Sequence, residues 1–392
     1  MKTVGIIAEF NPFHNGHKLI IEKVKQENNR IVCVIGDDFT QRGDIAIISK
    51  YARAEAALRC GADLCVLMPT PWSMSCAANF ALGGVSILKE LGATAIAFGS
   101  ECGDIDKIKR VSAAAHSDNL SALMENELKK GTTFAKARQI ALEQIIAKDS
   151  EVLSNPNDTL ATEYIYAAEK LDFHPEFISI KREGCSHDSA SLEGDIVSAS
   201  AIRSAVESEK IADVLSHMPK AAYDILLREY NDDKCASIKN IDTAILAALR
   251  QLTADDLKNT PEVAEGLENK IVASIAQASS ISQVIELSKS KRYTMARIRR
   301  ILLSAFLGID MSFFDKPVPY VKVLGFNKTG EAIIKNAKPA VPLINRSRDY
   351  LLLEGDAKKC FELQNKAANL YALASKSITP CNRELSEKII KI

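Results

Sequence analysis

Short apolar runs alternate with amphipathic stretches through the first two hundred residues of the chain. Five of these runs have the length and apolar character of buried strands, and they cover residues 4–8, 31–35, 63–67, 94–98 and 177–180. Between them, apolar residues recur at helical spacing over residues 17–27, 49–60 and 75–91, and a longer helical insert lies between residues 105 and 147. Strands that alternate with helices are typical of a parallel sheet with right-handed crossovers. The pattern therefore predicts an α/β, Rossmann-like domain.

From about residue 205 the pattern becomes mainly helical. Helical spacing covers residues 223–229, 241–252, 259–278, 281–307 and 351–375, with a return to strand-like alternation over residues 318–344. A length of 392 residues suggests two or three domains. We therefore predict a Rossmann-like, nucleotide-binding catalytic domain over residues 1–204 and a mainly helical domain over residues 205–392.

Composition narrows the classes of function. Lys+Arg and Asp+Glu both number 50, so the formal net charge is zero, which excludes a uniformly basic nucleic-acid coat but allows a local basic patch. No apolar stretch approaches the roughly 18 residues that a membrane helix needs, and no signal-peptide pattern is visible. The nine cysteines include no Cys-x-x-Cys pair, which favours buried thiols in a reducing compartment. We expect a cytoplasmic protein with no membrane or DNA partner and no metal held by its own side chains.

Polar loops that mostly contain glycine follow the five predicted strands. They cover residues 10–17, 36–43, 69–73, 99–103 and 181–188. In parallel sheets, ligands bind beyond the carboxyl ends of the strands, near the switch in strand order. The loops therefore predict a binding site at one edge of the sheet.

The first of these loops carries the pattern His-x-Gly-His at residues 14–17. Gly16 has no Cβ, so its backbone can approach a phosphate closely. His17 falls in the first turn of a predicted helix, where free N–H groups and the helix dipole favour an anion. His14 and His17 can then donate hydrogen bonds to charge that develops on one phosphate. Two ordinary surface histidines are the alternative, but a chain with only six histidines favours the phosphate site.

This segment resembles the His-x-Gly-His nucleotidyltransferase superfamily, in which the two histidines and the glycine-containing turn bind ATP phosphates. That superfamily also has an element of the form Ser-x-Thr/Ser-x-Ile-Arg at a helix start, and residues 198–203 read Ser-Ala-Ser-Ala-Ile-Arg. Ser198 can cap the helix, and Arg203 with the helix terminus can hold phosphate oxygens.

A closer resemblance is to the bacterial tRNA(Met) cytidine acetate ligase family. Residues 9–17 read Glu-Phe-Asn-Pro-Phe-His-Asn-Gly-His, and segments at residues 39–43, 61–64, 98–101, 156–157, 291–300 and 319–327 also fit, in the same order along nearly the whole chain. The resemblance implies an ATP-dependent ligase. Such an enzyme makes acetyl-adenylate from acetate and ATP, and then transfers the acetyl group to N4 of the wobble cytidine of elongator tRNA(Met). ATP is then a substrate, with Mg²⁺ carried by its phosphates.

The resemblance also implies which residues act. The expected catalytic residues are His14, His17 and Arg203. The expected ATP contacts are Ile7, Ala8, Glu9, Phe10, Asn11, Pro12, Phe13, His14, Asn15, Gly16, His17, Lys18, Leu19 and Ile20 in the first loop and helix, and then Gly99, Asn157, Arg182, Ser198 and Ser200.

The chain departs from the family pattern at three places. Leu67 stands where a Glu is common, Asp158 where a second Asn is usual, and Ser186 where a Tyr is usual. These differences bear on acceptor or acetate geometry, because both motif histidines and Arg203 are intact. Glu9, inside the phosphate loop, could act near the acceptor, or equally cap a helix or form a local pair.

Other polar residues of the loops have functional and structural interpretations. Arg42 could pair with a carboxylate or phosphate, or form a surface salt bridge, and its place on the predicted edge favours the former. Asp37 and Asp38 could help to hold Mg²⁺, although adjacent acids in a loop are more often simply solvated.

A basic segment lies in the second half. Residues 289–300 contain six basic residues and no acid, and Tyr293 among them could stack on a base. A solvated helix face is the alternative, but a neutral protein needs a local basic surface to bind RNA. The expected tRNA contacts are Lys289, Lys291, Arg292, Tyr293, Arg297 and Arg299.

Two other functions remain open at this stage. One is an adenylyl- or cytidylyltransferase for a small phosphorylated coenzyme precursor, and the other is a non-catalytic nucleotide- or RNA-binding homologue. The basic segment and the long second half speak against the former, and the intact motif residues speak against the latter. The sequence leaves open the carboxylate, the tRNA and its modified position, and the oligomeric state.

Overall fold

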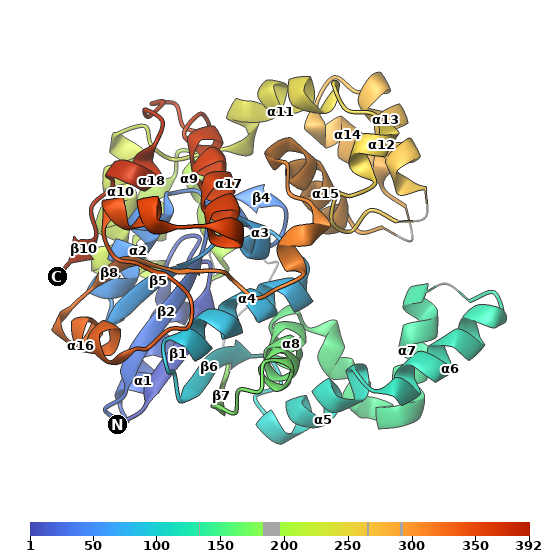
Figure 1. The fold of residues 1–392 in the computed structure, drawn as a ribbon, viewed down its shortest axis with the longest axis horizontal. Coiled ribbons are helices and arrows are strands. Elements are labelled where there is room, and N and C mark those ends of the chain that lie inside the picture. Colours follow the sequence, from blue (N-terminus) through green and yellow to red (C-terminus); the bar gives the residue numbers. More distant parts are fainter. Residues whose placement is uncertain (133, 183–196, 265, 291–292) are drawn as a thin grey trace.

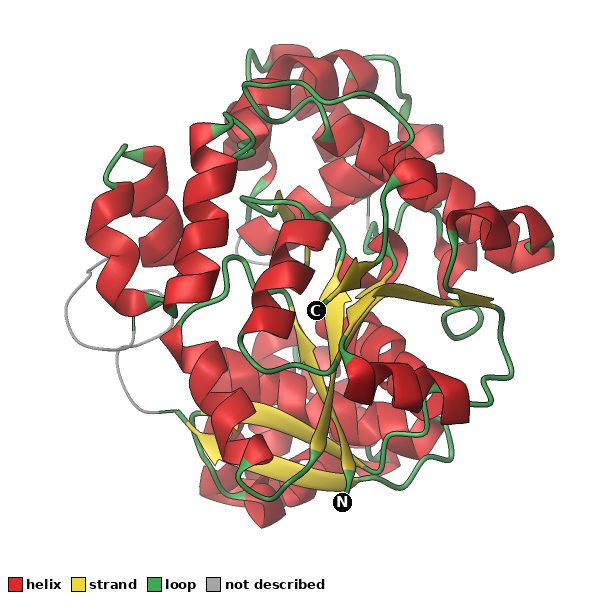
Figure 2. Ribbon diagram, turned by 90° about the vertical axis from the view of Figure 1, so that its left-hand side faces the viewer, coloured by secondary structure: helices red, strands yellow, loops and turns green. Residues whose placement is uncertain are grey.

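The computed structural model describes residues 1–132, 134–182, 197–264, 266–290 and 293–392. Its centre is a mostly parallel sheet flanked by helices (Figures 1 and 2). Five strands lie in the order β5-β2-β1-β6-β7, all parallel. They are β1 Thr3–Ala8, β2 Arg30–Gly36, β5 Leu64–Met68, β6 Ala95–Ser100 and β7 Glu176–Lys181. All five predicted strands are confirmed.

Helices cover both faces of this sheet because its strands are apolar on both sides. The residues Val4 and Ile6 of β1 pack into one core with α1 (Asn15–Lys25) and α2 (Lys50–Arg59). Ile7, on the opposite face, packs into a second core with α4 (Ala77–Glu90) and α8 (Pro156–Lys170). A Cβ at Gly5 would lie 2.3 Å from a methyl carbon of Leu88, so only glycine lets α4 approach β1 this closely.

The C-terminal segment returns to the same sheet. Strand β8 (Val321–Phe326) lies antiparallel to β5, and β9 (Leu343–Ile344) and β10 (Ile390–Lys391) pair with β8. The predicted strand-like stretch 318–344 is therefore interrupted by a helix, α16 (Lys328–Asn336). The proposed division after residue 204 separates two sequence regions that share one sheet.

The predicted insert forms an arm that projects from the sheet (Figure 1). It consists of α5 (Ile105–Ala115), α6 (Asp118–Lys129), α7 (Phe134–Ile146) and a 3-10 helix, Ala147–Ser154. Leu120, Ala141 and Leu142 belong to a small core within this arm.

The remaining helices build the helical region of the second half. They are α9 Ala199–Glu207, α10 Lys220–Asn231, α11 Asp242–Leu249, α12 Ala254–Leu257, α13 Leu267–Gln277, α14 Ile281–Ser288, α15 Met295–Leu307, α17 Gly355–Tyr371 and α18 Arg383–Ser386. The prediction of one helix over residues 281–307 is wrong, because α14 ends at Ser288 and Thr294 caps a new helix. Among the described residues, no helix is long and apolar enough to cross a membrane.

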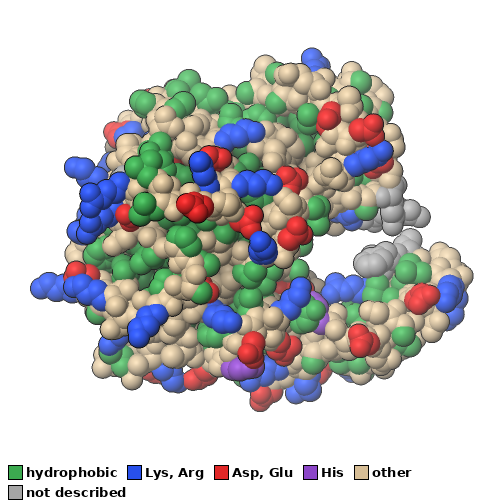
Figure 3. Space-filling view, in the orientation of Figure 1, with side chains coloured by type: hydrophobic (Ala, Val, Ile, Leu, Met, Phe, Trp, Pro, Cys, Tyr) green, Lys and Arg blue, Asp and Glu red, His purple; other side chains and the backbone are tan. Residues whose placement is uncertain are grey.

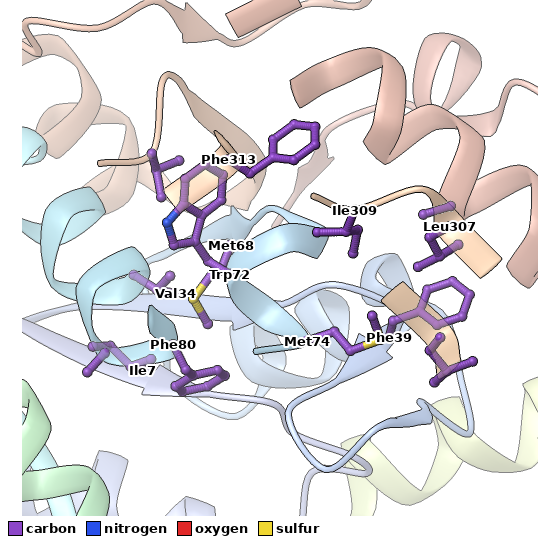
Figure 4. Packing of buried hydrophobic residues seen from close by; sticks show 14 of the residues in the cluster. Ile7, Val34, Phe39, Met68, Trp72, Met74, Phe80, Leu307, Ile309 and Phe313 are labelled. Atoms are coloured by element: carbon purple, nitrogen blue, oxygen red, sulfur yellow. The ribbon is translucent and has the colours of Figure 1, made fainter. Parts of the chain in front are cut away.

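One core joins the two halves of the chain. Trp72, in the short helix α3 (Thr70–Ser73) after β5, is buried and meets Phe314 edge-to-face at 6.0 Å between ring centroids. Figure 4 shows Trp72 beside Phe313, with Leu307 and Ile309 nearer Phe39 of the hairpin after β2. That hairpin pairs β3 (Phe39–Thr40) with β4 (Asp44–Ile45). The helical region is thus packed directly on the loops that surround the carboxyl end of the sheet.

Candidate active site

A cavity of about 480 Å³ opens at the carboxyl ends of the parallel strands. Four of the five predicted loops contribute described residues to its wall, including His14 and His17 from the first, Gln41 and Arg42 from the second, Gly99 from the fourth and Arg182 from the fifth. The remaining loop, 69–73, lies beneath it, where Ser73 donates a hydrogen bond to the carbonyl oxygen of Phe39. The sheet edge at which we predicted a binding site therefore contains a cavity, and most of the predicted loops contribute to its wall.

His14 and His17 form the start of α1 and line the cavity. His14 is the N-cap, and its Nδ1 accepts the N–H of Gly16 at 3.1 Å. Nδ1 of His17, in the first turn as predicted, accepts the N–H of His14 at 3.2 Å. Because each Nδ1 acts as an acceptor, the neutral rings carry their proton on Nε2. Both imidazoles are thereby set up as donors, with ring centroids 3.8 Å apart.

Two phenylalanines fix this arrangement from behind. Phe10 and Phe13 are buried, with ring centroids 4.9 Å and 5.5 Å from that of His17. Phe10 has a φ of +49°, a left-handed conformation that costs a non-glycine residue about 1 kcal/mol. The packing of its ring offsets this cost and turns the chain from β1 into the helix start.

Arg203 and the start of α9 form the wall of the cavity next to the first loop. Ser198 is the N-cap, accepting the N–H of Ala201 at 3.1 Å, as predicted. Arg203 donates from Nη1 to the carbonyl oxygen of Asn11 at 2.8 Å and also lines the cavity. Burial lowers the pKa of Arg203 below its usual value, while the charges of Asp44 and Glu9 oppose that shift. The first loop and the second motif element, far apart in sequence, therefore meet at one wall.

Glu9 is the one carboxylate in this wall among the described residues. Its Oε1 accepts the N–H of Gln41 at 2.7 Å, and its backbone carbonyl accepts Nη1 of Arg53 at 2.6 Å. Burial raises the pKa of Glu9 above its usual 4.5, although the hydrogen bond from Gln41 and the nearby Arg53, Arg203 and Arg42 oppose the rise. Arg42 lines the same wall, in line with its functional interpretation.

The opposite wall suits a nucleoside. Ile20 and Arg182 lie near the face of Gly99 in β6, at 3.3 Å and 3.4 Å from a hypothetical Cβ. Arg182 follows β7, and its N–H bonds the carbonyl oxygen of Ser100 at 2.9 Å. Asn157, in the first turn of α8, donates to Glu101 at 2.5 Å. Ile20, Gly99, Asn157 and Arg182 all line the cavity.

The predicted ATP contacts divide into two groups. Those that line the cavity are Ile7, Ala8, Glu9, Phe10, Asn11, His14, His17, Ile20, Gly99, Asn157, Arg182, Ser198 and Ser200. Those that do not are Pro12, Phe13, Asn15, Gly16, Lys18 and Leu19. Of these, Asn15 donates to the carbonyl oxygen of Ser216, and Lys18 pairs with Glu22 at 3.4 Å.

The departures at Leu67 and Asp158 lie outside the cavity wall. Leu67 is fully buried in the sheet among apolar neighbours. Asp158 is also fully buried, and it accepts hydrogen bonds from the hydroxyl of Ser100 and from the N–H of Cys102, so it ties α8 to the end of β6. Ser186 lies outside the described residues.

The basic segment does not lie on one helix face. Lys289 follows α14 and pairs with Glu286 at 2.5 Å, whereas Arg297 and Arg299 are in α15. Arg297 donates to the carbonyl oxygen of Glu262, at 2.6 Å from Nη2, and lies 4.9 Å over the ring of Tyr293. Lys291 and Arg292 lie outside the described residues. The segment reaches the cavity rim, since a Cβ at Gly43 of the hairpin would lie 2.5 Å from Cβ of Arg299.

Sequence reasoning missed a buried charge cluster behind the cavity. It contains Asp37, Asp38, Lys50, Arg53, Lys322 and Glu384, three acids and three bases, all nine-tenths or more buried. Lys50 bonds Asp37 at 2.6 Å and also pairs with Glu384, which pairs in turn with Lys322. Asp37 and Asp38 are therefore neither solvated nor in the cavity wall, and both interpretations of this pair are wrong.

Arg53 is the member of this cluster that touches the site. It donates to the carbonyl oxygens of Glu9, Gly36, Asp37 and Ile48 at 2.6–3.1 Å. These bonds hold the ends of β1 and β2 together below the cavity floor. No sequence signal marked it, because an arginine in an amphipathic stretch reads as solvent-exposed. Within the described ranges, no three His, Cys, Asp or Glu side chains come together as a metal site.

Comparison with known proteins shows which family this chain matches. The family model described as HIGH Nucleotidyl Transferase matches residues 1–386. The tRNA(Met) cytidine acetate ligase of Caldanaerobacter subterraneus subsp. tengcongensis is 37% identical over 406 residues, covering 100% of both chains. The chain belongs to the tRNA(Met) cytidine acetate ligase family. The predicted family resemblance is confirmed.

A second relative and two solved structures support this assignment. The tRNA(Met) cytidine acetate ligase of Clostridium acetobutylicum is 36% identical, over 94% of this chain and 97% of that one. The crystal structure of Thermotoga maritima TmcAL (apo, form I) matches with a TM-score of 0.94 and 30% identity, covering 100% of both chains. The same protein bound with alpha-thio ATP (form II) matches with a TM-score of 0.92 and 28% identity over both full lengths. The Rossmann-like fold prediction is thus confirmed.

Proposed function

We propose that this protein is an ATP-dependent ligase that acetylates N4 of the wobble cytidine of elongator tRNA(Met). The observation that carries the proposal is the meeting of His14, His17 and Arg203 at one wall of a nucleotide-sized cavity, in a chain that matches ligases of this name along its whole length. The reaction has two steps. Acetate first attacks the α-phosphorus of ATP and releases pyrophosphate, and the cytidine amine then takes the acetyl group from acetyl-adenylate and releases AMP.

The first step needs charge stabilisation more than covalent help from the protein. Because Nδ1 of each histidine accepts a backbone N–H, the Nε2–H groups of His14 and His17 would act as the donors to the phosphates. Arg203, held by its hydrogen bond to the carbonyl oxygen of Asn11, adds a positive charge at the same wall. The start of α1 contributes its dipole to the same anion. These groups would stabilise the charge that moves onto pyrophosphate.

Magnesium fits this scheme as part of the substrate. The described residues offer no cluster of metal ligands, whereas ATP phosphates bind Mg²⁺ readily. The ion would arrive with ATP and neutralise the pyrophosphate. The chain's own contribution is the positioning of the nucleotide between Gly99 and Arg182 on one side and the histidines on the other.

The tRNA side is proposed to be the helical region together with the arm. In the space-filling view, a wide opening separates the arm from the helical region, and basic side chains are visible on both sides of it (Figure 3). Lys289, Lys291, Arg292, Tyr293, Arg297 and Arg299 remain the proposed tRNA contacts. Because Arg297 already donates to the carbonyl oxygen of Glu262, we expect it to contribute less to tRNA binding than the other proposed contacts that the structure describes. A tRNA substrate would place the reaction in the cytoplasm.

The decisive experiment measures pyrophosphate release from ATP and Mg²⁺, with and without acetate and bulk bacterial tRNA, followed by nucleoside analysis of the tRNA. Acetate-dependent release together with N4-acetylcytidine in the RNA is the expected result. Release that does not depend on acetate would favour a nucleotidyltransferase acting on a phosphorylated coenzyme precursor. ATP binding without any turnover would favour a non-catalytic homologue.

A further inference from the structure

Glu9 is poorly suited to the contact with ATP that its place in the loop suggests. A carboxylate repels phosphate oxygens, yet this side chain lines the cavity beside Arg42 and Arg203. Its Cγ lies 3.6 Å from a hypothetical Cβ on Gly36, so it lies over the end of β2. Tyr164 of α8, in the same wall, is buried and close enough for the charge of Glu9 to raise its pKa. The chemistry of this corner therefore differs from that of the phosphate side.

The second step of the proposed reaction needs a proton acceptor. The cytidine amine carries no charge, and it must lose a proton as its nitrogen bonds to the acetyl carbon. The Nδ1 atoms of His14 and His17 already accept backbone N–H groups, so both rings present donors to the cavity. Arg42 and Arg203 are cations. Of the described groups in the cavity wall, the carboxylate of Glu9 is the ionisable acceptor.

We propose that Glu9 is the general base for acetyl transfer, an inference that rests on the proposed function. The lone pair of N4 attacks the acetyl carbonyl carbon of acetyl-adenylate, and the bond from that carbon to the phosphate oxygen breaks to release AMP. The N4 proton passes to Glu9 Oε2, because Oε1 accepts the N–H of Gln41. Arg53, Arg203, Arg42 and Tyr164 are the charged and titratable groups that face Glu9 from the elements around it.

Arg300 is the positioning residue for this base. The backbone N–H of Gln41 donates a hydrogen bond to Glu9, and the backbone carbonyl oxygen of Gln41 accepts one from Nη1 of Arg300 at 3.1 Å. Gln41 is therefore held from both sides. Arg300 is itself fixed by Glu262, with Nε and Nη2 at 2.5 Å and 2.6 Å from the carboxylate oxygens. The hairpin is pressed against α15 at Gly43, where a Cβ would lie 2.7 Å from the backbone nitrogen of Arg300. The proposed tRNA-binding helix thus orients the proposed base.

The two half-reactions of the full-length enzyme separate this role from ATP binding. Acetate-dependent ATP–pyrophosphate exchange, measured without tRNA, reports acetyl-adenylate formation. Single-turnover acetyl transfer from preformed enzyme-bound acetyl-adenylate to tRNA, measured with radiolabelled acetate, reports the second step. Glu9→Gln should reduce acetyl transfer by about 10²–10⁴-fold and exchange by a much smaller factor. Glu207→Gln, which removes an exposed carboxylate of α9 paired with Lys239, is the matched control and should transfer acetyl at the wild-type rate.

The pH profile adds a readout that a structural defect would not reproduce. Wild-type transfer should fall as the pH drops through a midpoint above 4.5, because Glu9 is then protonated, and this dependence should vanish in Glu9→Gln. Equal losses in both half-reactions, or wild-type transfer by Glu9→Gln, would overturn the proposal. An inactive wild type, without exchange or acetylated tRNA, would instead overturn the proposed function.

Arg300→Lys tests the positioning role. Lysine can keep the pair with Glu262 but cannot also reach Gln41 with the same geometry. Gln41 would then hold Glu9 less firmly, and because that hydrogen bond lowers the pKa of Glu9, the midpoint of the transfer profile should move upward. A slower transfer with an unmoved midpoint would show that Arg300 acts only on the structure.

Discussion

Replacement of Arg53 by Met should destabilise the whole protein. The guanidinium is fully buried and donates to four backbone carbonyls and to Asp38, and methionine supplies none of these donors. Breaking a buried ionic network of this kind costs about 3–5 kcal/mol. With an unfolding entropy of about 2.1 cal/mol/K per residue, the 392 residues give about 0.8 kcal/mol/K. The melting temperature should therefore fall by about 4–6 °C.

Differential scanning calorimetry of the full-length variants measures this shift directly. Arg59→Met is the matched control, because Arg59 is on the same helix, is half-exposed and pairs with Glu55 at i,i+4. Its loss should shift melting by less than about 1 °C. An Arg53→Met protein that melts within about 1 °C of the wild type would show that the carbonyls of Glu9 and Gly36 find other donors. Arg53 would then not be the residue that holds the ends of β1 and β2 together below the cavity.

His17→Ala and Arg203→Ala should each abolish acetate-dependent ATP–pyrophosphate exchange with little change in melting, and normal exchange by both variants would place the active site elsewhere. Alanine at Lys289 and Arg299 should weaken tRNA binding and lower its salt slope by about one unit per lost phosphate contact, with unchanged exchange; an unaltered salt titration would contradict the RNA surface. Lys322 and Lys50 lower the pKa of Glu384 from 4.5 to about 2, despite its burial. Its ionised form therefore contributes about 3 kcal/mol that is present above pH 4.5 and lost towards pH 2. Glu384→Gln should thus unfold more easily than the wild type at neutral pH, and the difference in calorimetric melting should narrow on acidification.

The parallel sheet could be predicted because its strands are apolar on both faces and are separated by helices. The length of each apolar run and the turn residues that flank it therefore identify the strands. The place of His14, Gly16 and His17 at the start of α1 could be predicted because these residues are close in sequence and their arrangement depends on local helix geometry. In both cases the determining interactions are short-range.

The rest depends on contacts between distant residues. Lys50 and Arg53 read as the polar face of a helix, yet they are buried because Glu384 and the carbonyls of two strand ends neutralise them. Arg300 stood out in the sequence only as one of six basic residues in the segment 289–300, and only the fold shows that its guanidinium bonds Glu262 and Gln41. No local pattern reveals such partners, because the closing loops span from 38 to 334 residues.

The antiparallel seam between β5 and β8 has a consequence for synthesis. Residues 64–68 leave the ribosome some 250 residues before their partner, Val321–Phe326. At 5–20 residues per second, the edge of β5 stays without this neighbour for about 12–50 s. The backbone groups on this edge of β5 pair with β8 only then, and Lys322 and Glu384 join the buried charge cluster at the same late stage, whereas Asp37 and Asp38 find Lys50 and Arg53 close by in sequence. Completion of the sheet thus waits for the C-terminal segment of the nascent chain, a delay during which a chaperone or early folding of the N-terminal helices has to shield that edge.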